Sequence, residues 1–342
     1  MNNITSLTQQ LVSIPSNVDE NNNETKVADF IFDYLTSNSN LKLVKEPVKD
    51  GRYNILASNG EDVDTLVIGH TDTVAGFIKP TIIDNKLYGR GTTDMKGGIA
   101  AMMLLACQKK LPSNIGFLFY IDEEYSFLGM KQFIADYGDK LQPKTIISLD
   151  GSELEISNGC RGLIEIEFAV KGISCHAATP QNGISAINNG VAICEQLANS
   201  INTPVNIGLI SGGTAPNLVA DNCNITIDIR PSKSSINGQM VAKVISELAK
   251  NLSVKIDNLK INYNFGSWIT PKNELNKFGL QFKDIHNSGY IDIQLLWEKF
   301  NKPVCFTIGA GTQSKAHTAD EYVEIEKLNK LPQILLDIIN KI

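Results

Sequence analysis

The spacing of hydrophobic residues predicts alternating helices and strands over the first part of the chain. Residues 4–38 carry apolar side chains at helical intervals, with polar breaks at residues 15–17 and 21–23. Strand-like apolar runs occupy residues 41–48, 53–57, 66–69, 115–121 and 145–149, and helical patterns occupy residues 99–106 and 129–137. Residues 81–88 predict a hairpin that turns at Asp84-Asn85. Together these patterns indicate a largely parallel or mixed sheet.

The hydrophobic pattern changes near residue 161. Residues 162–172 alternate between apolar and polar side chains, which is typical of a strand with one face in water. Further patterns predict a helix at 183–199, strands at 205–210 and 223–230, a helix at 237–252 and a strand at 254–263. This order of strand, helix, two strands, helix and strand is the split βαβ arrangement of a separate small domain, ferredoxin-like in class.

The last part of the chain returns to the first pattern. A helix is predicted near residues 290–300, a strand at 303–308, a glycine-rich turn next, and a closing helix from residue 325. We therefore expect an α/β catalytic domain with a mixed sheet, formed by residues 1–160 and 270–342. Residues 161–269 would be an α+β domain inserted into it. The length of 342 residues is consistent with two domains.

Composition narrows the class of protein. Hydrophobic residues make up 42% and charged residues 20%, as in an ordinary globular protein. The 31 basic and 37 acidic residues form no basic block, so nucleic acid is not an expected partner. No apolar run approaches the roughly 20 residues that span a membrane. No signal peptide is recognisable at the start, and the six cysteines have no C-x-x-C spacing, so a cytoplasmic protein with reduced thiols is expected.

Potential metal ligands stand where the predicted strands end. They are His70, Asp94, Glu123, Glu124, Asp150 and His317. Two imidazoles and three carboxylates can hold two zinc ions that share one carboxylate, which leaves one acid for proton transfer. Each of these residues alone is more often a capped loop or a solvated turn. Their joint position at one sheet edge makes a metal site the favoured interpretation.

Four stretches then resemble a known family. They are IGHTDTV at 68–74, YGRGTTDMKGG at 88–98, DEE at 122–124 and KGISCHA at 171–177. They are similar to the co-catalytic zinc aminoacylases and peptidases, which include acetylornithine deacetylase, succinyl-diaminopimelate desuccinylase and glutamate-type carboxypeptidases. The resemblance covers essentially the whole chain. It implies a zinc hydrolase fold with an inserted lid, through which two subunits dimerise.

The resemblance also implies a role for each site residue. His70, Asp94 and Asp150 would hold one zinc ion, and Asp94, Glu124 and His317 the other, with cobalt or manganese as substitutes. Asp150 departs from the pattern, because many members have a glutamate before a proline there. Glu123 would be the general base, Asp72 would orient His70, and the peptide bond between Asp94 and Met95 would be cis. His176 would stabilise the oxyanion in the partner subunit's site, although a surface histidine is the alternative. The remaining histidine, His286, matches no motif.

Substrate-binding candidates are less specific. SGGTAPN at 211–217, which ends at Asn217, and DIR at 228–230, which ends at Arg230, resemble stretches that hold the substrate. A guanidinium group suits a free carboxylate, but Arg230 is equally an ordinary strand-end arginine. Gly311 lies in a GAGT turn that could approach a ligand or simply turn the chain. Arg161 is a weaker candidate at the predicted domain junction.

The favoured function is deacylation of an N-acyl amino acid. The stretch KAHTADEYV at 315–323 resembles acetylornithine deacetylase and relatives of the acetyl-lysine type. The alternatives are succinyl-diaminopimelate desuccinylase, a dipeptidase or carboxypeptidase, and a non-catalytic binding protein on the same scaffold. The last would be expected to lack a ligand or the base, and all six residues are present.

Overall fold

A computed structural model describes residues 3–285 and 293–342, which form two compact units. One unit contains residues 3–159, 269–285 and 293–342, and the other contains Cys160–Trp268. His286 and the beginning of the helix predicted near residues 290–300 lie outside the described residues. No helix in the described part of the chain is both long enough and apolar enough to cross a membrane.

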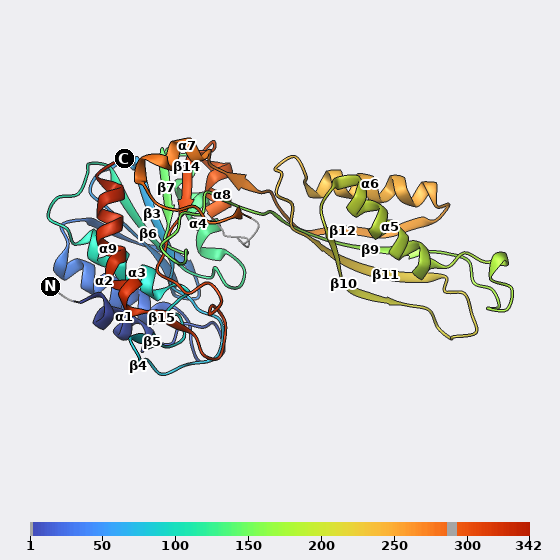
Figure 1. Cartoon of the computed structure of the whole chain (residues 1–342), viewed down its shortest axis with the longest axis horizontal. Helices are drawn as coiled ribbons and strands as arrows, with labels where there is room; N and C mark the ends of the chain where they lie inside the picture. The colour runs from blue at the N-terminus through green and yellow to red at the C-terminus, as the bar shows by residue number, and fades with distance from the viewer. Residues whose placement is uncertain (1–2, 286–292) are drawn as a thin grey trace. The chain divides into compact units, whose positions relative to one another are not determined.

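The first unit is built on a six-stranded mixed sheet, as the apolar runs predict (Figure 1). Across the sheet the strands are β1 (Lys42–Lys49), β2 (Arg52–Ser58), β6 (Ile115–Tyr120), β3 (Thr65–His70), β7 (Thr145–Ser148) and β14 (Val304–Thr307). The neighbours from β6 to β14 pair in parallel, whereas β1 and β2 are antiparallel. Parallel pairing brings the carboxyl ends of β6, β3 and β7 to one edge, where functional sites of such sheets lie.

Helices cover both faces of this sheet (Figure 1). They are α1 (Ile4–Val12), α2 (Thr25–Asn38), α3 (Lys96–Ala106), α4 (Leu128–Tyr137), α7 (Lys272–Leu275), α8 (Ile293–Lys299) and α9 (Ile325–Ile339). Apolar side chains of α1, α2, α3 and α9 form one core with the sheet. Helix α3 is apolar on all sides because α1 and α9 pack on it as well as the sheet.

The segment after His317 forms one strand of a small antiparallel sheet. It contains β4 (Thr81–Ile83), β5 (Lys86–Tyr88) and β15 (Tyr322–Glu324). The predicted hairpin is confirmed, since β4 and β5 pair around Asp84 and Asn85, which both have positive φ. Because β15 pairs with β5, the chain that follows His317 lies beside the loop that leads to Asp94.

The second unit is a four-stranded antiparallel sheet with two helices (Figure 1). Its elements are β9 (Leu163–Lys171), α5 (Ala186–Ile201), β10 (Val205–Gly212), β11 (Asn222–Ile229), α6 (Gly238–Asn251) and β12 (Lys255–Phe265). The strand order β10-β11-β9-β12 belongs to the split βαβ class, and the unit has its own apolar core. The chain crosses between the units within β8 (Gly159–Cys160) and β13 (Trp268–Ile269).

The starts of two helices differ from the prediction, since α3 begins at Lys96 instead of residue 99. Helix α5 begins at Ala186 instead of residue 183, because Pro180–Asn182 forms a separate 3₁₀ turn. The Ser185 side chain then accepts a hydrogen bond from the backbone N–H of Asn188, which is the N-cap arrangement.

Candidate metal centre

The candidate ligands come from the carboxyl edge of the parallel strands. His70 is the last residue of β3, Glu123 and Glu124 follow β6, and Asp150 follows β7. Asp94 precedes α3, and His317 precedes β15. Because β6, β3 and β7 are neighbours in the sheet, their ends converge on one place.

Asp94 is the central residue of the cluster. Its Oδ1 lies 2.9 Å from Nε2 of His70, and its Oδ2 lies 3.1 Å from Nε2 of His317. The same nitrogen of His317 lies 2.8 Å from Oε1 of Glu124. His70 is fully buried, whereas half of the His317 side chain is exposed. One side of the cluster is therefore open to solvent.

Three groups in this cluster bring their ligand atoms within 4.8 Å of one another. They are His70 with Asp94 and Asp150, Asp94 with Glu124 and His317, and His70 with Glu123 and Glu124. The first two groups share Asp94, and they are the two sets that the sequence resemblance implies. The third places Glu123 beside the ligand candidates. The five nitrogen and oxygen donors suit zinc, and no cysteine belongs to any of these groups.

The charge balance of the cluster favours bound cations. Burial disfavours a proton on His70, but the carboxylates of Asp72 and Asp94 outweigh it and hold the pKa of His70 well above its usual value. Hydrogen bonds that the His317 ring donates to the carboxylates of Asp94 and Glu124 raise the pKa of His317 to about 10. Burial opposes ionisation of Asp94, but both imidazoles more than compensate and lower its pKa. An imidazole must lose its proton before the ring nitrogen can bind a metal, so metal binding here would release protons.

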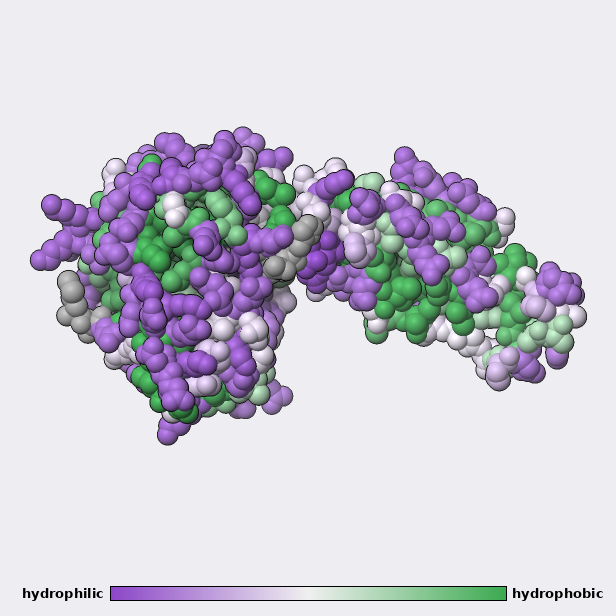
Figure 2. Space-filling view, in the orientation of Figure 1, coloured by the Kyte–Doolittle hydropathy of each residue, from purple (hydrophilic) through white to green (hydrophobic). Residues whose placement is uncertain are grey.

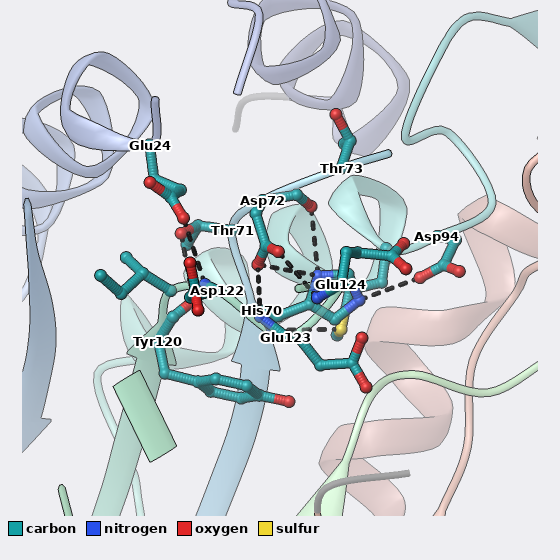
Figure 3. A network of polar contacts seen from close by, with 12 residues as sticks. Glu24, His70, Thr71, Asp72, Thr73, Asp94, Tyr120, Asp122, Glu123 and Glu124 are labelled. Carbon is teal, nitrogen blue, oxygen red and sulfur yellow. Dashed lines mark hydrogen bonds and ion pairs between the residues drawn. The ribbon is translucent and has the colours of Figure 1, made fainter. Parts of the chain in front are cut away.

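Asp72 supports two parts of the site (Figure 3). Nδ1 of His70 lies 3.1 Å from the backbone oxygen of Asp72 and 3.5 Å from its carboxylate. The two carboxylate oxygens also accept hydrogen bonds from the backbone N–H groups of Glu123, at 3.1 Å, and Glu124, at 2.9 Å. The fully buried Asp72 therefore lies between the first histidine and the acidic turn. The bonds to the acidic turn were not predicted, because nothing in the sequence pairs these residues.

Glu321 is a further site residue that sequence reasoning missed. Its Oε1 accepts backbone hydrogen bonds from Gly91 and Thr93, both at 3.0 Å, and from Asp94 at 3.3 Å. Its Oε2 accepts a 2.6 Å bond from the Arg90 guanidinium group. Glu321 is 1% exposed. It ties the segment that follows His317 to the loop that ends at Asp94, so both ligand candidates depend on its position.

Two smaller expectations concern the backbone. The peptide bond between Asp94 and Met95 is cis, as the resemblance implies. Gly311, a substrate candidate, packs closely: a β-carbon there would lie 2.9 Å from the backbone oxygen of Gly151 and 3.0 Å from that of Thr93. Close packing therefore already accounts for a glycine at this position.

The other candidates belong to the second unit. His176 is exposed, and its Nδ1 accepts a hydrogen bond from the backbone of Ala178. Asn217 lies in the adjacent segment, and its backbone oxygen accepts a 2.9 Å bond from Ala177. Nε of Arg230 donates to Asp228 at 2.8 Å and Nη2 at 3.0 Å, so this guanidinium group already has a carboxylate partner. Arg161 is half-buried just before β9.

Known proteins are similar to this chain in sequence. The model of Peptidase family M20/M25/M40 matches residues 66–341. Acetylornithine deacetylase of Buchnera aphidicola subsp. Schizaphis graminum is 26% identical over 97% of this chain and 96% of its own length. A probable carboxypeptidase of Aspergillus clavatus is 28% identical over 71% of this chain and 66% of its own length.

Solved structures share the fold. Aminopeptidase PepT of Bacillus cereus has a TM-score of 0.81 at 21% identity, with 99% of this chain and 98% of that chain covered. The YXEP protein of Bacillus subtilis, described as a dinuclear metal-binding peptidase, has a TM-score of 0.72 at 15% identity, with 99% of this chain and 98% of that chain covered. The chain thus belongs to Peptidase family M20/M25/M40 and is a metal-binding hydrolase.

Proposed function

We propose that the protein removes the acyl group from an N-acyl amino acid at a site with two zinc ions. The observation that carries this proposal is the position of Asp94, which belongs to two candidate ligand groups at once. One group adds His70 and Asp150, and the other adds Glu124 and His317. Cobalt and manganese accept the same donors and would be substitutes.

The residues around the proposed metals divide the chemistry among them. Bound zinc supplies Lewis-acid activation of a water molecule and of the amide carbonyl. Glu123 accepts the proton of that water and passes it to the leaving amine. Asp72 holds His70 and the turn of Glu123 in place. His176 donates a hydrogen bond to the oxyanion in the partner subunit's site.

The preferred substrate in this proposal is a basic N-acetyl amino acid of the acetylornithine type, which would place the enzyme in arginine biosynthesis. The stretch at 315–323 and the 26% identity to an acetylornithine deacetylase support this choice. Asn217, Arg230, Arg161 and Gly311 remain the substrate-binding candidates. Succinyl-diaminopimelate desuccinylase, an enzyme of lysine biosynthesis, is the first alternative. A peptidase is the second, and similarity to probable carboxypeptidases supports it.

We also propose a cytoplasmic homodimer formed through the second unit. Strand β10 is an edge of its sheet, and Leu209 and Ile210 on it are 70% and 48% exposed. Figure 2 shows apolar residues gathered over this part of the second unit. An exposed apolar edge strand is a ready surface for pairing with another chain. None of the six cysteines forms a disulfide bond, which is consistent with a reducing compartment.

The test is a release assay on three substrates with metal content counted on the same sample. N-acetylornithine, N-succinyl-diaminopimelate and a plain dipeptide are compared before chelation, after chelation and after zinc is added back. Preference for the acetyl substrate, with about two metals per chain, would support the proposal. Preference for the succinyl substrate would instead indicate a desuccinylase, and preference for the dipeptide would indicate a peptidase. Full activity in the chelated protein would overturn the metal mechanism.

A further inference from the structure

A buried guanidinium group lies behind the acidic turn of the site (Figure 3 shows its two carboxylate partners, Glu24 and Asp122). Nε of Arg52 donates to Glu24 at 2.7 Å, and Nη2 donates both to Glu24 and to Asp122 at 2.5 Å. The three residues are 7%, 0% and 2% exposed, respectively. Glu24 and Arg52 precede residue 66, where the match to the family model begins.

Asp122 shapes the turn that contains Glu123 and Glu124. Its φ angle is +68°, in the left-handed region that residues with a side chain rarely adopt. Its Oδ2 accepts backbone hydrogen bonds from Ser126 at 3.1 Å and Leu128 at 3.3 Å. The turn is therefore folded around the Asp122 carboxylate, whose other oxygen is bound by Arg52.

The turn is held from two sides. On one side Asp72 accepts the backbone N–H groups of Glu123 and Glu124. On the other side Glu24 accepts the backbone N–H of Asp122 at 3.1 Å. The carboxylates of Glu24 and Asp122 are both buried, so they would repel each other without the cation between them. Arg52 is the residue that bonds to both carboxylates and keeps them close to the turn.

The shape of the guanidinium group matters as well as its charge. Arg52 makes a two-pronged bond to Glu24 and still reaches Asp122 with Nη2. A lysine ammonium group carries the same charge but has no planar fork, so it cannot reproduce this pattern. A lysine substitution thus keeps the charge and removes the geometry.

We propose that Arg52 is a positioning residue for the site, acting through Asp122 on the placement of Glu123 and Glu124. This inference rests on the proposed function, because it takes Glu124 as a metal ligand and Glu123 as the proton carrier. The side-chain bonds of Arg52 go to Glu24 and Asp122, which are not among the candidate metal ligands. Its effect is confined to the acidic turn, whereas His70, Asp94 and Asp150 stand on other segments.

The test is Arg52→Lys in the full-length chain, with metal binding measured by competition with a chromophoric chelator. We expect one of the two metal ions to bind roughly 10- to 100-fold more weakly, because only the group with Glu124 is disturbed. We expect kcat to fall by a similar factor while KM changes by less than about twofold, because Glu123 acts in the chemical step.

A matched control separates positioning from general loss of stability. Leu335→Ala removes buried side-chain atoms in α9, away from the acidic turn. The two variants are compared at temperatures equally far below their unfolding midpoints. Leu335→Ala should keep both metal affinities and kcat. Glu24→Gln is the second test if Arg52→Lys does not fold, and the same selective loss is expected from it.

The outcomes distinguish this inference from the proposed function. Arg52→Lys, or Glu24→Gln in its place, with both metal affinities and kcat like the wild type would overturn the role of Arg52. An equal loss in Leu335→Ala would overturn it too, because the effect would then be general. A wild-type chain that binds no pair of metals would overturn the proposed function itself.

Discussion

Asp94 and His317 meet at 3.1 Å between Oδ2 and Nε2, although one precedes α3 and the other precedes β15. The other oxygen of Asp94 lies 2.9 Å from His70. A single carboxylate thus presents each oxygen to a different imidazole, which is the arrangement needed to bridge two cations. Glu321 keeps the two chain segments together from behind.

Replacing Glu123 with glutamine should separate catalysis from metal binding. The amide is nearly the same size but cannot accept the proton of water, so kcat should fall about 10²- to 10⁴-fold. The metal content should stay near that of the wild type, because the two groups that share Asp94 remain. The exposed Glu61 provides the control, since Glu61→Gln should be neutral. Undiminished turnover in Glu123→Gln would rule out Glu123 as the base.

Replacing Glu321 with glutamine should weaken metal binding without removing a ligand. The buried Arg90 would lose its charged partner, and the loop that ends at Asp94 would be held by a neutral amide. We expect a loss of roughly 10- to 100-fold in affinity for both metals, since Asp94 belongs to both groups. Chelator competition measures this change. Wild-type affinity for both metals would show that Asp94 is held without Glu321.

Metal binding should release protons, and affinity should fall as the pH falls. Hydrogen bonds donated to the carboxylates of Asp94 and Glu124 raise the pKa of His317 to about 10, so the ring is expected to carry a proton at neutral pH when no metal is bound. That proton must leave before the nitrogen can ligate. Calorimetry of zinc binding in buffers of different ionisation enthalpy counts the protons. A heat that does not depend on the buffer would contradict this prediction.

Glu46 should make stability depend on pH away from the site. Burial, together with the negative charge of Asp136, raises its pKa from 4.5 to about 7, against a 2.5 Å hydrogen bond from Asn54. Because folding raises this pKa, the carboxyl group contributes its full share to the free energy of unfolding only below pH 4.5. This contribution is lost as the pH rises through 7. The loss is about 1.4 kcal/mol for each unit between the two values.

Glu46→Gln removes this ionisation. The urea midpoint of the variant should therefore rise relative to that of the wild type as the pH increases from about 5 to about 8. Glu61→Gln, in an exposed loop, is the control and should follow the wild type. A difference between wild type and Glu46→Gln that stays constant over this pH range would show that Glu46 does not titrate there.

The sequence predicts the parts of the site that follow from local patterns. Apart from His317, each ligand candidate lies at the end of an apolar strand or just before a buried helix, and parallel strands bring such strand ends to one edge. These local patterns are sufficient to predict that His70, Glu124 and Asp150 lie together. His317 depends more on the resemblance, because its own surroundings are a loop with no periodic pattern.

The supporting residues could not be predicted in this way. Glu321, Arg52 and Glu24 are charged residues that single-sequence reasoning assigns to the surface, yet all three are buried. Their partners lie in distant segments, so only the folded chain shows that each charge is compensated. The start of α5 was missed for a local reason, since the 3₁₀ turn before Ser185 has no hydrophobic period of its own.

The most direct test of the dinuclear site is the number of metals bound by Asp94→Asn. Wild type and variant are loaded with zinc, freed of excess metal and measured by elemental analysis, with hydrolysis followed on the same samples. The wild type should hold about two metals per chain, and the variant should lose both metals and its activity, because Asp94 belongs to both groups. A variant that keeps two metals and turns over substrate would contradict the shared role of Asp94.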